Sequence, residues 1–573
     1  MPGDVTTTAI ESVENAQQAG VTAPKARTAP RGLWLLPSFT DLAMLLPFFL
    51  LFTKLNGFSY LIGDGSTGWH IRTGEWILEH GRVPTQDIFS FTMAGRPWFA
   101  WEWLWDVAFA SLHRLGGLNA IVVASMAVLS VTFGLLYRLV RRRCENMLIA
   151  IAATALAIMI STVHWLARPH LFTILFTAVF LWVLDRARGG RLRDLVVLPL
   201  LTLFWTNLHG GFFVGIMLVL TYAAGEILGG LVAAEPEARR AGVLRSKPYV
   251  ITAAACLLAS LVNPQFYKLH VHIFRFLVSE YQNPNMMEFM PFDFHHPMAR
   301  YFEPMLACGI LALGWNARQG RWTQAVLVAS WAHLALFSAR NLPLFALIAA
   351  PAVAEMFDEL VKLARESRGA AWIRNRARAI EELGREYAAM DGTGRFPVIG
   401  ALGPAALILL LYVPIHSPLL RAEYDPHKFP VAAASVVGRK DRVFTTDIWA
   451  GYLIYRFYPN QKVFLDDRSD FYGAEFCSRY LKLRRGNYDW QRTLERYRID
   501  TVLLPAGEPL AATLKESARW RPVYDDGVAI VFRLKDKQVS AGLVGGIFPV
   551  VARSRNSWPV ILGSPSTLMR GDA

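Results

Sequence analysis

Long apolar runs separated by short polar segments dominate the first 416 residues of the chain. Many of these runs approach the roughly 20 residues that a helix needs to cross a bilayer. Shorter runs also qualify where neighbouring helices bury them. We predict about eleven spans by this criterion. They lie near residues 39–62, 118–139, 146–166, 170–185, 195–208, 211–232, 249–265, 302–317, 324–339, 342–358 and 398–416. The pattern predicts an α-helical polytopic membrane protein whose transmembrane domain covers residues 38–416.

One apolar segment does not fit a full span. Residues 98–115 (WFAWEWLWDVAFASLHRL) contain Glu102 and Asp106, and unpaired charges are costly in the hydrocarbon region. We therefore expect a half-buried or re-entrant helix here. Together with the polar stretch that follows the first span, this helix forms the loop 63–117.

The chain changes character on either side of the transmembrane domain. Residues 420–535 alternate short strand patterns (VFTTD, KVFLDDR, TVLLP, VAIVF) with helical ones (WAGYLIYRFY, GAEFCSRYLKL, WQRTLERYRI, PLAATLKES), which is typical of a small α/β domain. Residues 1–37 are polar and lack the apolar core of a signal peptide, so we expect a disordered tail. Residues 536–573 show no clear period and stay unassigned.

Composition and charge support a membrane protein and give its orientation. Hydrophobic residues make up 53% of the chain and charged residues 18%, which excludes an ordinary soluble protein. The net charge of +14 comes largely from Lys and Arg on one side of the predicted spans. Because cytoplasmic loops retain basic residues, we expect a cytoplasmic N-terminus and an extracytoplasmic α/β domain. The charge is a topology signal, so we predict membrane lipids and no nucleic acid as partners.

Cysteine and histidine spacing predicts no metal centre. The cysteines are scattered without a metal-binding spacing, at Cys144, Cys256, Cys308 and Cys477. His295 and His296 are adjacent, but two histidines without further ligands are weak support for a metal. The sequence therefore predicts neither a disulfide framework nor a metal site from these residues.

The loop 63–117 begins with an acidic turn and an amphipathic helix. Asp64 lies in a Gly-Asp-Gly turn, and the following GWHIRTGEWILEHG places Trp69 on one side of an interfacial helix. A carboxylate in this position predicts a general base, with a turn or helix-capping residue as the alternative. His70 and Asp87 are further catalytic candidates, although an interfacial histidine and a turn aspartate are the favoured interpretations.

Polar residues at the outer ends of later spans complete the candidate site. Arg168 and Arg340 are notable because few basic residues lie on the outer side, and a guanidinium can bind phosphate through two hydrogen bonds. They could instead reach lipid headgroups or pair with the acids of residues 98–115. Asn207 and His209, in WTNLHGGF, add substrate-binding candidates, with a glycine-assisted interfacial turn as the alternative.

The α/β domain contains a charged motif, FLDDRSDFYG, at residues 464–473. Its Asp466, Asp467, Arg468 and Asp470 could contact an acceptor glycan. Ion pairs among these side chains are the favoured interpretation.

Several motifs resemble a known family. They are GDGSTGWHIRTGEWI with PTQDIFSFT, RPWFAWEWL, WTNLHGGF, VNPQ, ARNLPLFA and WAGYLIYRFYPNQKVFLDDRSDFYG. These motifs look like those of a family of bacterial multi-span proteins regarded as similar to the GT-C membrane glycosyltransferases. That superfamily includes the protein O-mannosyltransferases, the lipid A aminoarabinose transferase and the oligosaccharyltransferase catalytic subunits. The resemblance implies a GT-C-like fold, although the loop 63–117 lacks the Asp-Glu pair followed by tyrosine that several members carry.

The resemblance implies a glycosyltransferase of the bacterial inner membrane. It would take a sugar from a polyprenyl-phosphate carrier and transfer it to a glycan, lipid or protein acceptor on the outer face. Asp64 is the expected base, with Asp87 and His70 as further catalytic candidates. Asp64 and Asp87 could also hold a divalent cation, as in metal-dependent members, and no cofactor is certain. The substrate-binding candidates are Trp69, Glu102, Arg168, Asn207, His209 and Arg340.

A different class of function fits the same pattern. The chain could be a non-catalytic membrane protein that binds or moves a lipid-linked glycan or an envelope polymer. A transporter is disfavoured, because the ionisable groups gather at the outer ends of the predicted spans rather than at mid-membrane.

Overall fold

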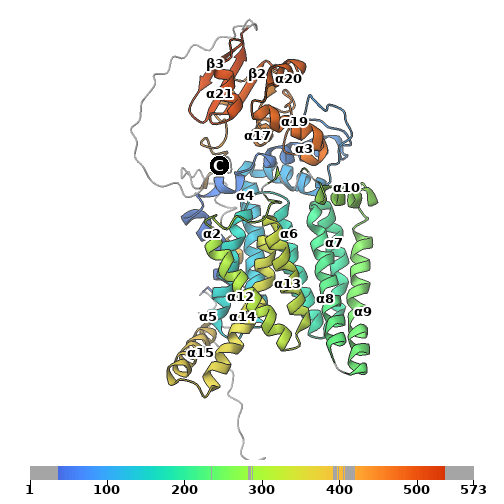
Figure 1. Ribbon diagram of the computed structural model, residues 1–573, viewed down its shortest axis with the longest axis vertical. Helices are drawn as coiled ribbons and strands as arrows, with labels where there is room; N and C mark the ends of the chain where they lie inside the picture. The colour runs from blue at the N-terminus through green and yellow to red at the C-terminus, as the bar shows by residue number, and fades with distance from the viewer. Residues whose placement is uncertain are drawn as a thin grey trace, which may run out of the picture.

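The computed structural model describes residues 37–233, 235–279, 281, 285–286, 288–391, 397, 399–403, 406 and 420–535. A bundle of helices carries a small α/β domain at one end (Figure 1). We call this end of the bundle the domain end and the opposite one the far end. The predicted tails 1–37 and 536–573 lie outside the described residues, apart from Pro37.

Every predicted span within the described residues overlaps a helix of the bundle. The span predicted at 398–416 lies mostly outside the described residues. The helices of this region are α2 (Phe39–Thr53), α3 (Ser66–His80), α4 (Trp103–Arg141), α5 (Met147–Ser161), α6 (His170–Arg188), α7 (Val197–Leu208), α8 (Phe213–Val232), α9 (Pro236–Ala259), α10 (Tyr267–Leu277), α12 (Ala299–Arg318), α13 (Trp322–Phe337), α14 (Leu342–Glu366) and α15 (Ala371–Asp391).

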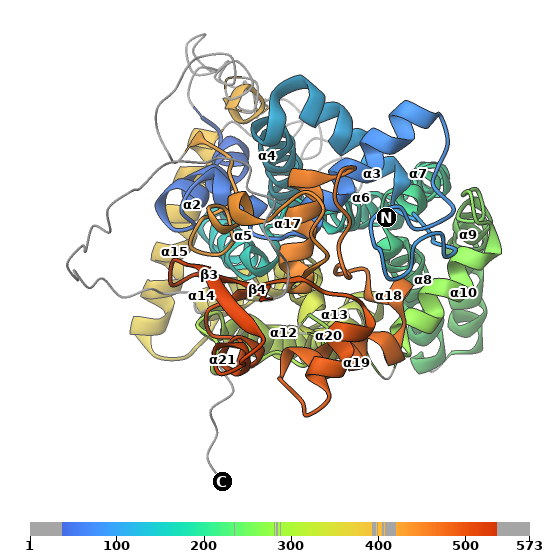
Figure 2. The ribbon, with the colours of Figure 1, turned by 90° about the horizontal axis from the view of Figure 1, so that it is seen from above.

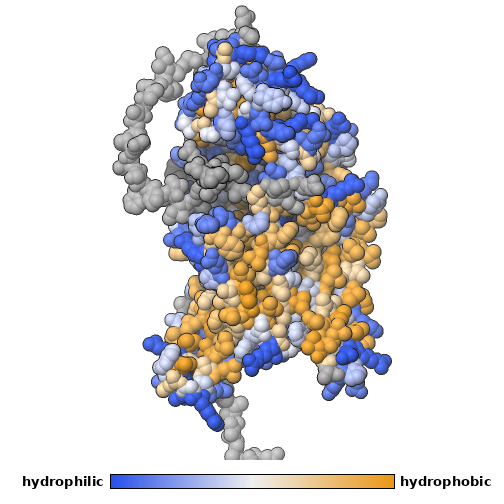
Figure 3. All heavy atoms as spheres, in the orientation of Figure 1, coloured by the Kyte–Doolittle hydropathy of each residue, from blue (hydrophilic) through white to orange (hydrophobic). Residues whose placement is uncertain are grey.

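The number of full membrane spans is smaller than predicted when helix length and hydropathy are both applied. Among the described residues, four helical segments are long and apolar enough to cross a membrane: Trp103–Arg141, Met147–His164, His170–Arg188 and Gly210–Val232. Phe39–Thr53 and Trp322–Phe337 are apolar but shorter. Helices such as α9 fall short because charged residues occupy much of their length. Apolar side chains nevertheless cover much of the bundle below the α/β domain (Figure 3), as in a membrane protein.

Helix α4 contains the break that the sequence pattern predicts between residues 98–115 and 118–139. Gly116 and Gly117 have non-helical backbone angles, and Gly117 has a φ of 62°, which a residue with a Cβ rarely adopts. Glu102 occupies the N-cap position of the helix, and its side chain makes no capping hydrogen bond. The break separates a short helix at the domain end from the apolar helix that follows it.

The α/β domain contains a four-stranded sheet in the order β1-β2-β4-β3. Strand β1 (Val443–Phe444) is parallel to β2 (Thr501–Pro505), and the β2–β4 and β4–β3 pairs are antiparallel, with β3 at Trp520–Asp525 and β4 at Ala529–Leu534. The helices are α17 (Asp447–Phe457), α18 (Ser469–Tyr472), α19 (Ala474–Arg484), α20 (Trp490–Arg496) and α21 (Pro509–Lys515).

Two details of this sheet differ from the prediction. KVFLDDR forms no strand of the sheet; its Val463 makes a single bridge to Ser90, because the segment runs beside the loop 63–117. Strand β3 was missed because Pro522 lies in its middle, and proline argues against a central strand. Strand β3 is the last in the sheet order, where proline is tolerated.

Glycines bring α17 of the domain into backbone contact with α3. A Cβ on Gly65 would lie 1.8 Å from the carbonyl oxygen of Ile448, and one on Gly451 would lie 2.3 Å from that of Gly65. Figure 2 shows the domain lying over the ends of the bundle helices. The contact between α3 and α17 therefore fixes one wall of the space between domain and bundle.

Replacing Gly74 with alanine is expected to destabilise the protein. The added Cβ would lie 1.9 Å from the carbonyl oxygen of Asp106, so α3 and α4 must separate, at a cost of about 1–3 kcal/mol. Gly314→Ala is the matched control, because it lies in α12 with no atom within 4 Å of its added Cβ. Alanine there should stabilise the helix slightly. Thermal unfolding in detergent compares the two variants, and equal melting temperatures would contradict the expected clash.

Candidate functional site

A cavity of about 110 Å³ lies between the domain end of the bundle and the α/β domain. We call it the central cavity. Aromatic residues form part of its wall: Trp69, Trp98, Phe99, Trp101 and Phe276. Its ionisable lining residues are His70, Glu102, Asp106, Arg168, His209, Glu288, Arg340, Asp467, Arg468 and Asp470. Segments far apart in the sequence therefore bring acids, bases and guanidinium groups to one place.

Glu102 lies between two histidines. Its Oε2 atom is 3.7 Å from Nε2 of His70, and its Oε1 atom is 3.6 Å from Nε2 of His209. The other ring nitrogen of His70, Nδ1, is 2.6 Å from Oδ1 of Asp106. When Asp106 is ionised it accepts this hydrogen bond from Nδ1 of His70, and the Nε2 lone pair of His70 then faces Glu102.

His209 has the opposite tautomer. Its Nδ1 atom accepts the backbone N–H of Gly211 at 3.1 Å and lies 2.7 Å from Oγ1 of Thr173. That hydroxyl accepts from Nε1 of Trp205 at 3.1 Å, so its own proton points to His209. The proton of neutral His209 is therefore on Nε2, on the side of Glu102. Glu102 thus has a proton acceptor on one side and a donor on the other.

Arg168 and Arg340 both line the central cavity. Nη1 of Arg168 donates to Oδ2 of Asp64 at 2.8 Å, and Oδ1 of Asp64 accepts from the backbone N–H of Ser66. The Arg340 guanidinium lies 4.5 Å from the ring centre of Phe289, in a cation–π contact. Two guanidinium groups are thus held from different segments of the bundle at the same cavity.

Arg468 joins the domain to the loop 63–117 by buried ion pairs. Its Nε and Nη2 atoms donate to the two oxygens of Asp466 at 2.6 and 2.7 Å. Nη2 also donates to Oδ1 of Asp87 at 2.8 Å. The favoured interpretation of FLDDRSDFYG as an ion-pair motif thus holds for Asp466 and Arg468. The neighbouring Asp467, which like Arg468 lines the cavity, accepts a hydrogen bond from Nε1 of Trp69 at 2.6 Å.

Burial and charge set the protonation states around the cavity. Burial raises the pKa of Glu102 to about 8, and the nearby Asp470 adds to this while Arg168 opposes it. Burial, followed by the Arg168 charge, holds the pKa of His70 well below its usual range. The pKa of Glu288 is lowered, because Arg340 and Arg168 outweigh the opposing effect of burial. At neutral pH the cavity contains a mostly neutral Glu102 and His70 beside an ionised Glu288.

The structure brings most of the predicted site residues together. Trp69, His70, Glu102, Arg168, His209 and Arg340 line the central cavity. Asn207 does not contribute among the described lining residues, because its Oδ1 accepts from Nε1 of Trp103 and its amide donates to two backbone carbonyls. Asp64 and Asp87 are not among the lining residues. Asp64 accepts a hydrogen bond from Arg168. The two carboxylate oxygens of Asp87 accept from the backbone N–H groups of Phe89 and Ser90 and from Arg468.

Several lining residues escaped sequence reasoning. Phe276 lies on α10 and Glu288 lies in the segment after it, and nothing in the local sequence sets either residue apart. Asp470 was considered as a partner within its own motif, yet its Oδ2 atom lies 3.0 Å from Nε2 of His272 on α10. Contacts between distant segments decide these positions.

We searched the described part of the chain for side chains that could bind a metal ion together. No group of three or more His, Cys, Asp or Glu side chains there is arranged to hold a metal ion. The predicted carboxylate pair is also divided, since Asp64 is bound to Arg168 and Asp87 to Arg468.

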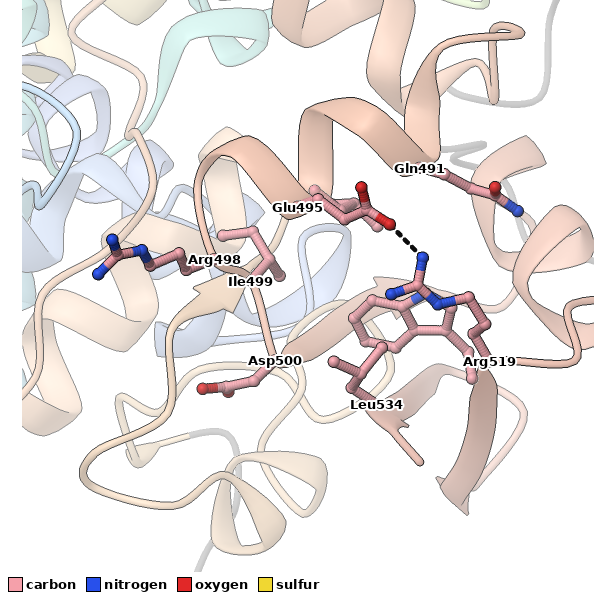
Figure 4. A pocket seen from close by; sticks show the side chains of 9 residues that line it. Gln491, Glu495, Arg498, Ile499, Asp500, Arg519 and Leu534 are labelled. Carbon is pink, nitrogen blue, oxygen red and sulfur yellow. Dashed lines mark hydrogen bonds and ion pairs between the residues drawn. The ribbon is translucent and has the colours of Figure 1, made fainter. Parts of the chain in front are cut away.

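A second cavity, of about 260 Å³, lies within the α/β domain and shares no lining residue with the central cavity. In Figure 4, Glu495 and Arg519 point toward each other beside it and form an ion pair, whereas Arg498 points away from them. Leu494, Ile499 and Trp520, all buried, also line it. Of these two cavities, only the central one brings acids, histidines and arginines together.

Comparison with known proteins gives similarity of fold without similarity of sequence. No protein-family model matches the chain, and no curated protein sequence does. The apo form of the Archaeoglobus fulgidus oligosaccharyltransferase is similar in structure, with a TM-score of 0.51, 10% identity, and coverage of 82% of this chain and 69% of that one. The same enzyme tethered to an acceptor peptide with the NVT sequon gives a TM-score of 0.49 at 11% identity, with the same coverage. The similarity to the apo form supports the GT-C-like fold expected for this membrane protein.

Proposed function

We propose that this protein is a membrane glycosyltransferase that transfers a sugar from a polyprenyl-phosphate carrier to a glycan, lipid or protein acceptor. One observation carries the proposal: Arg168, Arg340 and Glu102 line one cavity where the apolar bundle meets the hydrophilic domain. Sugar transfer from such a carrier needs cations for the leaving phosphate, a base for the acceptor, and a nearby apolar surface for the lipid. The orientation in the bacterial inner membrane, with the domain outside, belongs to the proposal.

The chemistry can be assigned to residues of the cavity. An acceptor oxygen forms a bond to C1 of the sugar while the bond from C1 to the phosphate oxygen breaks. The acceptor proton passes to the carboxylate of Glu102, and the phosphate leaves with the bonding electron pair. Arg168 and Arg340 stabilise its charge.

This assignment differs from the sequence-based choice of Asp64 as the base. Asp64 forms an ion pair with Arg168 at 2.8 Å, so we infer that it positions this guanidinium. The variant Asp64→Asn separates the two assignments. If Glu102 is the base, Asp64→Asn should lower turnover and leave the pH dependence of turnover unchanged. If the pH dependence disappears in this variant, Asp64 is the base.

The test is release of polyprenyl phosphate by the purified protein in lipid nanodiscs. A panel of polyprenyl-phosphate sugars serves as donors, and a cell-envelope extract supplies the acceptor. We expect one donor to be consumed by the wild type. Binding of a carrier without turnover in the presence of the extract would contradict the enzyme and favour a protein that binds or moves lipid-linked glycan.

Arg340→Gln should lower turnover by roughly 100-fold, the loss typical of removing one donor to a developing oxyanion. The reason is that Arg340 has no carboxylate partner at hydrogen-bond distance among the described residues and is available to phosphate. Arg275→Gln is the matched control, because this arginine lies on α10 at the same end of the bundle and is exposed. Equal turnover of the two variants would rule out a role of Arg340 in phosphate binding.

A further inference from the structure

Helix α15 lies across the far end of the bundle and extends beyond it (Figure 1). It packs on the bundle through small residues. The Asn146 amide donates to the carbonyl of Ile380 at 3.0 Å, and a Cβ on Gly384 would lie 2.6 Å from Oδ1 of Asn146. Ala377 and Gly384 are buried on this side. The described residues therefore hold the helix against the bundle along this face.

An apolar stripe adjoins the buried face and is open. Trp372 is 70% exposed, Leu383 43% and Met390 60%. Their spacing of 11 and then 7 residues places them on the same side of a helix. Large apolar side chains exposed in a row are uncommon on a helix surrounded by water, whereas a helix at a membrane interface uses such a stripe to enter the lipid.

Unbalanced positive charge accompanies the stripe in the first half of the helix. Residues 367–380 contain four arginines and no acidic residue. Arg368, Arg376 and Arg378 are exposed and make no ion pair with any described residue. Other arginines at the far end, such as Arg143 and Arg321, are bound to carboxylates. The charge around Trp372 therefore lacks a partner in the described chain.

We propose that the first half of α15 is a binding site for anionic phospholipid headgroups. Trp372 and the neighbouring Ile373, which is 37% exposed, enter the acyl region, and the arginines bind the phosphates. The basic residues place this end on the cytoplasmic side, where the leaflet carries negative charge. This site is independent of the proposed sugar transfer, since it lies at the opposite end of the bundle from the central cavity.

The test measures the affinity of the detergent-solubilised full-length protein for short-chain phosphatidylglycerol by native mass spectrometry. A double variant, Arg376→Gln with Arg378→Gln, should bind it roughly thirty-fold more weakly, from about 1 kcal/mol for each basic residue near an anionic surface. Short-chain phosphatidylcholine should bind weakly to both proteins. The control is Arg496→Gln with Arg521→Gln, two exposed arginines of the α/β domain, which should leave the affinity unchanged.

Three results would overturn the proposal. One is equal affinity of the wild type for the two lipids, and another is unchanged phosphatidylglycerol affinity in the α15 double variant. The third is binding of polyglutamate at this helix with no preference for phosphatidylglycerol, which would indicate an acidic protein partner. Circular dichroism of the variant checks that the helix content is retained. Sugar transfer by the wild type does not enter any of these readouts.

Discussion

Glu102→Gln is expected to reduce sugar transfer by about 100- to 10,000-fold, the contribution of a general base. The amide keeps the size of the side chain but cannot take the acceptor proton. Donor binding should persist, because Arg168 and Arg340 remain in place. Turnover in nanodiscs, together with the affinity for the polyprenyl-phosphate sugar, separates loss of chemistry from loss of binding. Glu79→Gln, in an exposed glutamate at the end of α3, should have no effect.

The pH dependence gives an independent check on the same residue. Burial raises the pKa of Glu102 from 4.5 to about 8, so the basic form appears only as the pH rises through about 8. Turnover should rise over this range and then level off. The free energy of unfolding should change in the opposite sense. Between pH 4.5 and about 8 the folded protein holds the Glu102 proton and the unfolded chain does not, so the free energy of unfolding falls as the pH rises through this range. Both slopes should disappear in Glu102→Gln, and a slope that persists would assign the titration to another group.

Arg468→Met is expected to lower the free energy of unfolding by about 3–5 kcal/mol, the cost of removing one partner from a buried ion pair. The guanidinium is 2% exposed, and its partners Asp466 and Asp87 are fully buried. Without it, two carboxylates remain buried and unpaired. Because these contacts join the α/β domain to the loop 63–117, the domain should separate from the bundle before the bundle unfolds.

The measurement is thermal unfolding combined with limited proteolysis of the α/β domain. Arg479→Met is the matched control in the same domain, because Arg479 pairs with Glu475 where both side chains are mostly exposed. Such a surface pair contributes at most about 1 kcal/mol. If the two variants melt alike and resist protease equally, the buried cluster does not hold the domain.

The helices could be predicted from the sequence because lipid and neighbouring helices impose the same apolar pattern. Every predicted span in the described part of the chain meets a helix, and the Gly116-Gly117 break falls where the charged segment ends. Only four of the described helical segments are long and apolar enough to cross a membrane, since several helices combine apolar stretches with charged ends. The strand β3 was hidden by Pro522, whose missing N–H is harmless on the last strand of the sheet.

Some residues that line the central cavity could be selected from the sequence, but their contacts with one another could not. Arg168 and Arg340 could be chosen because basic residues are rare at that side of the pattern. The partner of Arg168 could not, because Asp64 lies 104 positions away and residues 98–115 offered nearer carboxylates. Glu288 reaches the cavity through tertiary contacts that leave no local signal, whereas Asp467 was singled out only as part of its charged motif. The elevated pKa of Glu102 likewise depends on burial by several segments at once.

The glycine contact between α3 and α17 bears on how the protein is made. Gly65 is synthesised early and Gly451 late, yet their backbones touch. The ribosome must therefore add almost the whole bundle before α17 can dock and Asp467 can close the cavity. The order of synthesis thus leaves the central cavity incomplete until residues 467–470 of the α/β domain have been made.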